Sequence, residues 1–287
     1  MRSQSGGEEA VLTAFLRRDR AIILTSLIAI ALLAWAWLIW FASAMKTKMP
    51  DTGMNMSGMD MGNMPGMAMA PAFTPWTPTH VMIMFAMWGI MMVGMMTPSV
   101  APMVLLYART ARSARAQGKP FAAASWFAAG YLATWLGFSL LATATQWAME
   151  WAALLSPMMK STDRTFGGYL LLIIGAYQWT PLKHACLSHC RAPLNFIQQH
   201  GGFRPQRLAA LELGMLHGAY CVGCCWALMA LLFLGGVMNL FWIAGLMVLV
   251  LLEKISPWGQ TVARAAGLVA MAAGLAMLAG FWQPPAA

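Results

Sequence analysis

Several runs of this 287-residue chain contain close to 20 consecutive, mostly apolar residues. A helix needs about 20 such residues to cross the roughly 30 Å hydrocarbon core of a bilayer. Hydrophobic residues make up 60% of the sequence and charged residues only 9%, a balance that ordinary soluble domains do not have. Because spanning helices satisfy every backbone hydrogen bond internally, we expect an all-α, polytopic membrane helix bundle.

The apolar runs predict about seven transmembrane helices, with a break in composition after the first one. The predicted spans are 21–44, 80–107, 121–147, 166–179, 208–234, 236–252 and 262–280. The first run is longer than the apolar part of a cleaved signal peptide, so we expect it to be a retained anchor. The expected organisation is a cytoplasmic tail at 1–20, an anchor helix at 21–44, a flexible external loop at 45–79 and a six-helix metal-binding membrane domain at 80–287.

The basic residues predict the orientation. The tail and the segments 108–120, 181–207 and 253–264 contain 14 Lys and Arg residues, and the alternate segments contain 4. Since cytoplasmic loops carry this excess, we expect a cytoplasmic N-terminus and a multi-pass protein of the bacterial inner membrane, in contact with the lipid bilayer. The net charge of +9 then serves orientation, and nucleic-acid binding is not expected, because no basic face with interleaved aromatic residues is present.

One of the predicted spans contains a concentrated set of polar ligands. His217, Cys221, Cys224 and Cys225 lie within nine residues of an apolar run. At about 100° per residue, the first three fall within an arc of about 60°, and Cys225 lies roughly 20° further round. Such groups are costly at membrane depth and indicate a functional site. The sequence therefore predicts a soft-metal site, although cysteine can also pack as a small hydrophobic residue.

A second group of thiols and imidazoles lies in the predicted cytoplasmic segment. Cys186, His189 and Cys190 have i, i+3, i+4 spacing, and His184 comes just before them. The spacing differs from the common zinc patterns and suits two-coordinate binding of Cu(I). The alternative is a surface loop with free thiols.

Methionine is the unusual component of the composition, with 27 residues. Soft thioethers select Cu(I), and they remain usable in an oxidising compartment where thiols form disulfides. Ag(I) would suit the same ligands, and a low-complexity linker is the alternative for the external loop. The candidate ligands in that loop are Met54, Met56, Met59, Met61 and Met64.

The second predicted span continues this pattern on one helical face, within an arc of about 80°. The candidate ligands there are His80, Met84, Met87, Met91 and Met95. Methionine is also an adaptable filler of hydrophobic cores, so both interpretations stay open. Contact between this span and the cysteine-bearing span is an assumption of the prediction.

Three motifs together carry a resemblance to a known family. They are the runs from Tyr177 to Arg191, from His217 to Trp226 and from Trp88 to Pro98, accompanied by Gly236-Val237-Met238-Asn239 and Glu253-Lys254. In these motifs the chain resembles an uncharacterised bacterial family described as predicted metal-binding integral membrane proteins, over about residues 80–280. The resemblance implies metal handling in a membrane. From their own pattern, Glu253 and Glu212 are expected to be interface anchors or partners of Lys and Arg.

The combined expectation is a copper-handling membrane protein that captures Cu(I) outside, passes it through the intramembrane site and delivers it to a copper chaperone or acceptor protein. No organic cofactor, no P-loop and no catalytic constellation is evident, so we do not expect an enzyme of a familiar class. Two alternatives remain open. Cys221-x-x-Cys224 has the spacing of a thiol–disulfide oxidoreductase, and the chain could also be a structural or copper-inserting subunit of a larger membrane complex.

Overall fold

The structure is a computed structural model that describes residues 3–48, 76–118, 122–155, 164–203 and 205–281. Within these ranges the regular structure is helical and no strand is formed, which confirms the all-α fold for the described residues. The helices are α1 (Ser3–Lys48), α2 (Pro78–Ala116), α3 (Ala124–Trp151), α4 (Arg164–Tyr177), α5 (Pro181–Arg191), α6 (Pro193–Gln199), α7 (Arg207–Ala230), α8 (Leu232–Gly235), α9 (Leu240–Ile255) and α10 (Gly259–Ala279).

Every predicted span overlaps a helix, but the span predicted at 208–234 runs over both α7 and α8, and the helices differ in length. Among the described residues, five segments are long and apolar enough to cross a membrane. They are 21–44 of α1, 78–114 of α2, 124–151 of α3, 207–235 across α7 and α8, and 259–279 of α10. Helix α4 has 14 residues and α9 has 16, so at about 1.5 Å per residue each is shorter than the hydrocarbon core.

The predicted cytoplasmic segment contains two short helices, α5 and α6. Thr180 caps α5, because its hydroxyl accepts a hydrogen bond from the Lys183 amide, and Pro181 occupies the first turn, where its missing N–H costs nothing. Helix α5 packs along α7. The predicted cytoplasmic segment is therefore largely helical over residues 181–199, and α5 carries two of the five cysteines.

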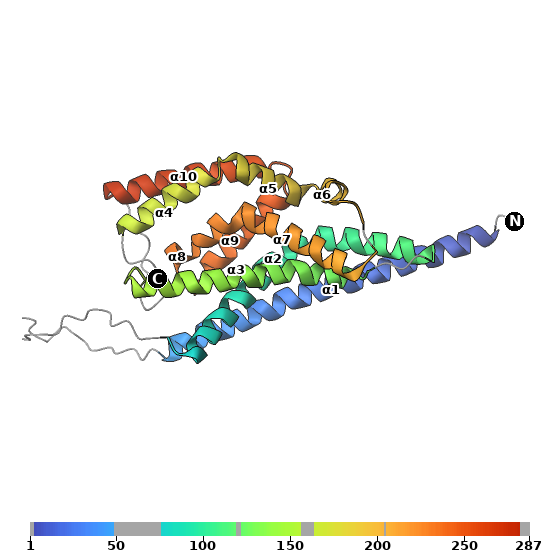
Figure 1. The fold of residues 1–287 in the computed structure, drawn as a ribbon, viewed down its shortest axis with the longest axis horizontal. Helices are drawn as coiled ribbons and strands as arrows, with labels where there is room; N and C mark the ends of the chain where they lie inside the picture. Colours follow the sequence, from blue (N-terminus) through green and yellow to red (C-terminus); the bar gives the residue numbers. More distant parts are fainter. Residues whose placement is uncertain (1–2, 49–75, 119–121, 156–163, 204, 282–287) are drawn as a thin grey trace, which may run out of the picture.

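The helices form an elongated bundle (Figure 1). Helix α2 packs between α1 and α3, α7 packs along α3, α4 pairs with α10, and α9 contacts both α2 and α10. The C-terminal end of α2 and the N-terminal ends of α1, α3 and α7 lie at one end of the bundle. Consecutive helices that cross a membrane in opposite directions would place their ends in this way.

Glycine allows α3 and α7 to approach until their backbones touch. A Cβ atom on Gly130 would lie 2.1 Å from the Leu211 carbonyl oxygen, and one on Gly214 would lie 2.1 Å from the Phe127 carbonyl oxygen. Small residues at helix contacts are a usual basis of packing in membranes. These contacts fix the rotation of α7 and so decide which of its residues face the interior.

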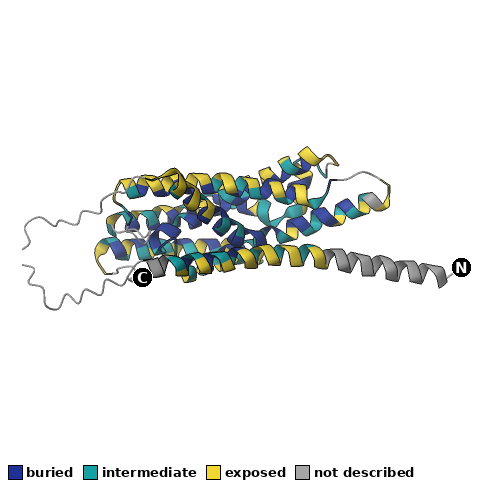
Figure 2. Ribbon diagram, turned by 90° about the horizontal axis from the view of Figure 1, so that it is seen from below, coloured by how far each residue is buried: buried dark blue, intermediate teal, exposed yellow. Residues whose placement is uncertain are grey.

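Much of the outer surface of the bundle is formed by exposed residues (Figure 2), and many of them are large and apolar. Leu33 is 70% exposed and Phe241 is 93% exposed. Monomeric soluble proteins rarely present apolar surface of this extent to water. The exposed apolar residues and the candidate spans agree on a membrane protein.

Candidate metal centre

Helix α7 carries the predicted ligands into the protein interior. His217, Cys221, Cys224 and Cys225 are all buried. Cys221 lies 14 residues after Arg207, the start of the helix, which is about 20 Å at 1.5 Å per residue. The thiols of Cys224 and Cys225 donate to the Cys221 carbonyl at 3.1 and 2.8 Å. Three thiols are thus gathered around one turn in the middle of the bundle.

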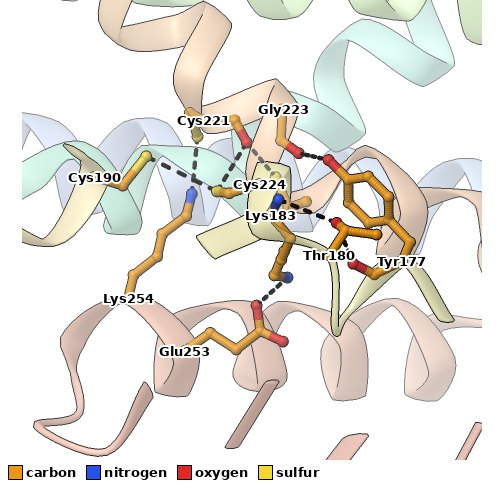
Figure 3. Close-up of polar contacts among 10 residues, drawn as sticks. Tyr177, Thr180, Lys183, Cys190, Cys221, Gly223, Cys224, Glu253 and Lys254 are labelled. Atoms are coloured by element: carbon orange, nitrogen blue, oxygen red, sulfur yellow. Dashed lines mark hydrogen bonds and ion pairs between the residues drawn. The ribbon is translucent and has the colours of Figure 1, made fainter. Parts of the chain in front are cut away.

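Helix α5 adds a fourth thiol to this group. The Sγ atoms of Cys190 and Cys224 lie 3.8 Å apart (Figure 3). We call Cys190, Cys221, Cys224 and Cys225 the cysteine cluster. With a metal–sulfur distance of about 2.3 Å, two sulfurs that share one ion at tetrahedral or trigonal angles lie about 3.8–4.0 Å apart. The Cys190–Cys224 pair therefore has a separation that fits one soft ion.

The remaining thiol lies against the backbone of α7. A Cβ atom on Gly223 would lie 2.8 Å from Cys186 Sγ, so this sulfur occupies space that only glycine leaves. Burial raises the pKa of the Cys186 thiol, and the neighbouring Cys224 adds to the increase, whereas Lys183 opposes it. All five cysteines are free thiols.

The two histidines of α5 point away from the cysteine cluster. His184 Nε2 lies 3.4 Å from Arg264 Nε, and partial burial together with the charges of Arg264 and Lys183 lowers the pKa of His184. The His189 ring stacks on Tyr220, with 4.4 Å between the ring centroids. The predicted set of Cys186, His189 and Cys190 is therefore divided among three different environments.

A half-buried lysine accompanies the cysteine cluster. Lys254 Nζ, at the end of α9, donates to Cys221 Sγ at 2.8 Å and to Ser99 Oγ at 3.2 Å, as Figure 3 shows for Cys221. The Tyr131 hydroxyl lies 3.0 Å from the same sulfur. An ammonium group in a low-dielectric interior stabilises negative charge on a neighbouring sulfur. Sequence reasoning missed this role, although a charge that follows a long apolar run was a signal for it.

A buried ion pair ties α5 to the same end of α9. Lys183 Nζ lies 2.6 Å from Glu253 Oε2, and the two side chains are 0% and 2% exposed. Arg191 adds hydrogen bonds to the carbonyls of Ser256 and Pro257 at 2.7 and 2.8 Å. The expectation that Glu253 pairs with a basic residue is confirmed. The consecutive residues Glu253 and Lys254 thus hold α5 and contact Cys221, respectively.

Helix α2 reaches the cysteine cluster through polar groups. Ser99 binds Lys254, and the Tyr131 hydroxyl, which contacts Cys221, also donates to the Met96 carbonyl at 3.3 Å. The second span and the cysteine-bearing span are therefore connected through Tyr131 of α3 and Lys254 of α9. The direct contact that was assumed between them stays a prediction.

The methionines of α2 lie in a tightly packed core. We call Met84, Met87, Met91 and Met95 the methionine stripe; each of them is at most 4% exposed. Met84 Sδ accepts a hydrogen bond from Gln146 at 3.6 Å. At the start of the helix, the ring centroids of His80 and Trp76 are 4.8 Å apart. The external methionines Met54, Met56, Met59, Met61 and Met64 lie outside the described residues.

Over the described part of the chain, no group of three or more His, Cys, Asp or Glu side chains is arranged so that it could hold a metal ion. The geometry offers the Cys190–Cys224 pair, with Cys221 bound to Lys254 beside it. Thiolates in such a pair are ligands for Cu(I) and similar soft ions.

Comparison with protein families identifies the metal more closely than ligand chemistry does. The model of the PpoB2 family, described as a copper chaperone, matches residues 85–277. Neither the curated proteins nor the solved structures yield a match. The matched range covers about two thirds of the chain and includes all five cysteines and Lys254. The metal handling implied by the earlier family resemblance is thereby narrowed to copper, and the chain belongs to the PpoB2 copper chaperone family.

Proposed function

We propose that this protein carries Cu(I) within a bacterial inner membrane and delivers it to an acceptor protein on the cytoplasmic side. The observation that carries the proposal is the 3.8 Å separation of Cys190 Sγ and Cys224 Sγ, with Lys254 beside them in the interior. Membership of a copper chaperone family and five candidate spans support it. The ion is the cargo of the protein and not a resident cofactor.

The charges of the cysteine cluster suit a monovalent ion. Two thiolates and one Cu(I) ion carry a net charge of −1, and an unpaired charge is costly in an apolar interior. The ammonium group of Lys254 offsets that charge. Cys190 and Cys224 supply the first two ligands, and Cys221 is close enough to Lys254 to exchange that contact for the ion. Cys225 and His217 complete the candidate set on α7.

The route to the cluster follows the order of soft ligands along the chain. The external methionines at 45–79 would gather the ion, and His80 with the methionine stripe would lead it inward. Weak sites in series let an ion bind and still leave. With the N-terminus in the cytoplasm, the basic ends of α2 and α7 meet the cytoplasmic face. The shorter helices α4 and α9 would complete seven spans, and Cys186 would lie on the delivery side.

Copper binding by the purified full-length protein in detergent tests the proposal. Titration of Cu(I) against a chromophoric competitor should give a tight, sulfur-bound equivalent, with X-ray absorption distances of about 2.3 Å. The double variant Cys190→Ser, Cys224→Ser should lose it. Ser188→Ala is the matched control, because Ser188 is exposed on the same helix and its hydroxyl donates to the Ala185 carbonyl of that helix. Equal binding by the double variant and the control would refute the proposal.

The same thiol pair supports a redox alternative. Free thiols 3.8 Å apart, together with the Cys221-x-x-Cys224 spacing, are also suited to thiol–disulfide exchange. Metal-free protein that reduces a partner disulfide while two of its own thiols form a disulfide, with loss of that activity in Cys190→Ser, would favour this function over copper transfer.

A further inference from the structure

A second cluster of imidazoles lies where α5, α6 and α7 meet, outside the cysteine cluster. His189 of α5 stacks on Tyr220 of α7 at 4.4 Å and 11°. His200, which follows α6, lies 4.6 Å from the Phe196 ring. The ring centroids of His189 and His200 are 6.1 Å apart, and both residues are half-buried. Two histidines that are 11 residues apart thus lie close together beside Tyr220 of α7.

The two histidines use their ring nitrogens in the same way. His189 Nδ1 lies 2.7 Å from the Ala185 carbonyl oxygen, and His200 Nδ1 lies 2.7 Å from the Phe196 carbonyl oxygen. A carbonyl oxygen only accepts, so Nδ1 carries the hydrogen and Nε2 of the neutral ring keeps its lone pair. Within the described ranges neither Nε2 atom has a hydrogen-bond partner. An Nδ1–H bonded to a backbone carbonyl is the usual support of a metal-binding histidine.

The spacing of the rings is also that of a shared ion. With metal–nitrogen distances of about 2.0–2.1 Å, two imidazoles bound to one ion through Nε2 have centroids about 5 to 6.4 Å apart, between tetrahedral and linear angles. The observed 6.1 Å falls in this range, towards the linear end. Stacking on Tyr220 and contact with Phe196 fix the rings, which reduces the cost of ordering them when an ion binds.

We propose that His189 and His200 form a second Cu(I) site, with two imidazole ligands, that exchanges the ion with the cysteine cluster. His189 precedes the cluster residue Cys190 directly in α5, so an ion moves only a short way between the two. Imidazole is a less soft ligand than thiolate, which makes this the weaker and more readily emptied site. Its half-buried position makes it the point where an acceptor protein takes the ion. The exchange of copper between this site, the cysteine cluster and an acceptor protein rests on the proposed function.

X-ray absorption on the full-length protein in detergent, loaded with one and then two equivalents of Cu(I), tests this site. The first equivalent should be bound by sulfur, and the second should add nitrogen ligands at about 2.0 Å. His189→Gln and His200→Gln should each lose the second equivalent and keep the first. His184→Gln is the matched control, because it removes an imidazole from the same helix that faces Arg264 instead, and it should bind both equivalents.

A measurement on the unaltered protein removes the dependence on variant folding. Two equivalents of Cu(I) should protect His189 and His200, but not His184, from modification by diethyl pyrocarbonate, and one equivalent should protect neither. Retention of the nitrogen-bound equivalent by both glutamine variants, or equal modification with and without copper, overturns the second site. A wild type that binds only the sulfur equivalent also overturns it and leaves the proposed function intact. A wild type that binds only the nitrogen equivalent supports the second site and refutes the cysteine cluster.

Discussion

The cysteine cluster and the methionine stripe both present soft sulfur ligands in the interior, but their surroundings differ. The stripe is enclosed by apolar side chains, among them Trp88, and one of its four sulfurs accepts a weak hydrogen bond. The cluster is accompanied by Lys254, by the Tyr131 hydroxyl and by the nearby Lys183–Glu253 pair. Polar groups at this depth cost free energy and are retained where they have a function. Ligand type alone therefore does not identify a site, whereas charge beside the ligand does.

The largest expected effect is loss of the ion pair that anchors α5. Glu253→Gln leaves the Lys183 ammonium buried without a counter-charge, and removal of one partner of a buried pair costs about 3–5 kcal/mol. Met91→Leu, a volume-conserving change in the methionine stripe, should cost less than about 1.5 kcal/mol. The free energy of unfolding in detergent measures both. If both variants lost a similar free energy of unfolding, the cysteine cluster and the methionine stripe would not differ in the energetic cost of their surroundings.

Substitutions in the cysteine cluster and in the methionine stripe should differ almost as strongly in their effect on Cu(I) affinity. Cys224→Ser should weaken Cu(I) binding at least about 100-fold, equivalent to roughly 2.7 kcal/mol, because it breaks the Cys190–Cys224 pair. Met91→Leu should change the affinity less than about threefold. Competition with a chromophoric Cu(I) chelator gives both constants. If the methionine variant lost more affinity than the serine variant, the principal ligands would lie on α2.

The charge beside the thiols should have an intermediate effect. Lys254→Met removes the ammonium that offsets the negative charge of a dithiolate–Cu(I) complex, and we expect about 10-fold weaker binding, as for other groups that support a metal ligand. Lys254→Arg keeps the charge and should recover part of the affinity. The same competition measurement applies, and unchanged affinity in the methionine variant would show that Lys254 has only a packing role.

The helices and the interior face of α7 were predictable because they depend on local periodicity. His217, Cys221, Cys224 and Cys225 are one to eight residues apart, so the geometry of a single helix brings them together. The docking of α5 was not predictable. Its basic residues indicated a cytoplasmic segment, whereas its docking depends on a partner of Lys183 that lies 70 residues away along the chain.

Long-range contacts also explain what was missed at the site. The Cys190–Cys224 pair joins residues 34 positions apart, and Lys254 reaches Cys221 from a third helix. His200 carried no signal in the sequence, because it stands alone after a short helix and approaches His189 only through the turn between α5 and α6. Helical spacing detects ligands that share a helix and cannot detect ligands that converge from several.

The smallest expected effect tests whether the methionine stripe belongs to the copper route at all. A variant with all four methionines replaced by leucine keeps the core volume, so its cysteine cluster should bind Cu(I) with an affinity within about threefold of wild type. As a series of weak sites, the stripe should instead affect the rate, and we expect the initial rate of Cu(I) entry into proteoliposomes to fall about threefold. Leu fills the same space as Met without offering a ligand. An unchanged rate would therefore mean that the methionine stripe only packs the core, and that the copper route involves only the cysteine cluster and the groups around it.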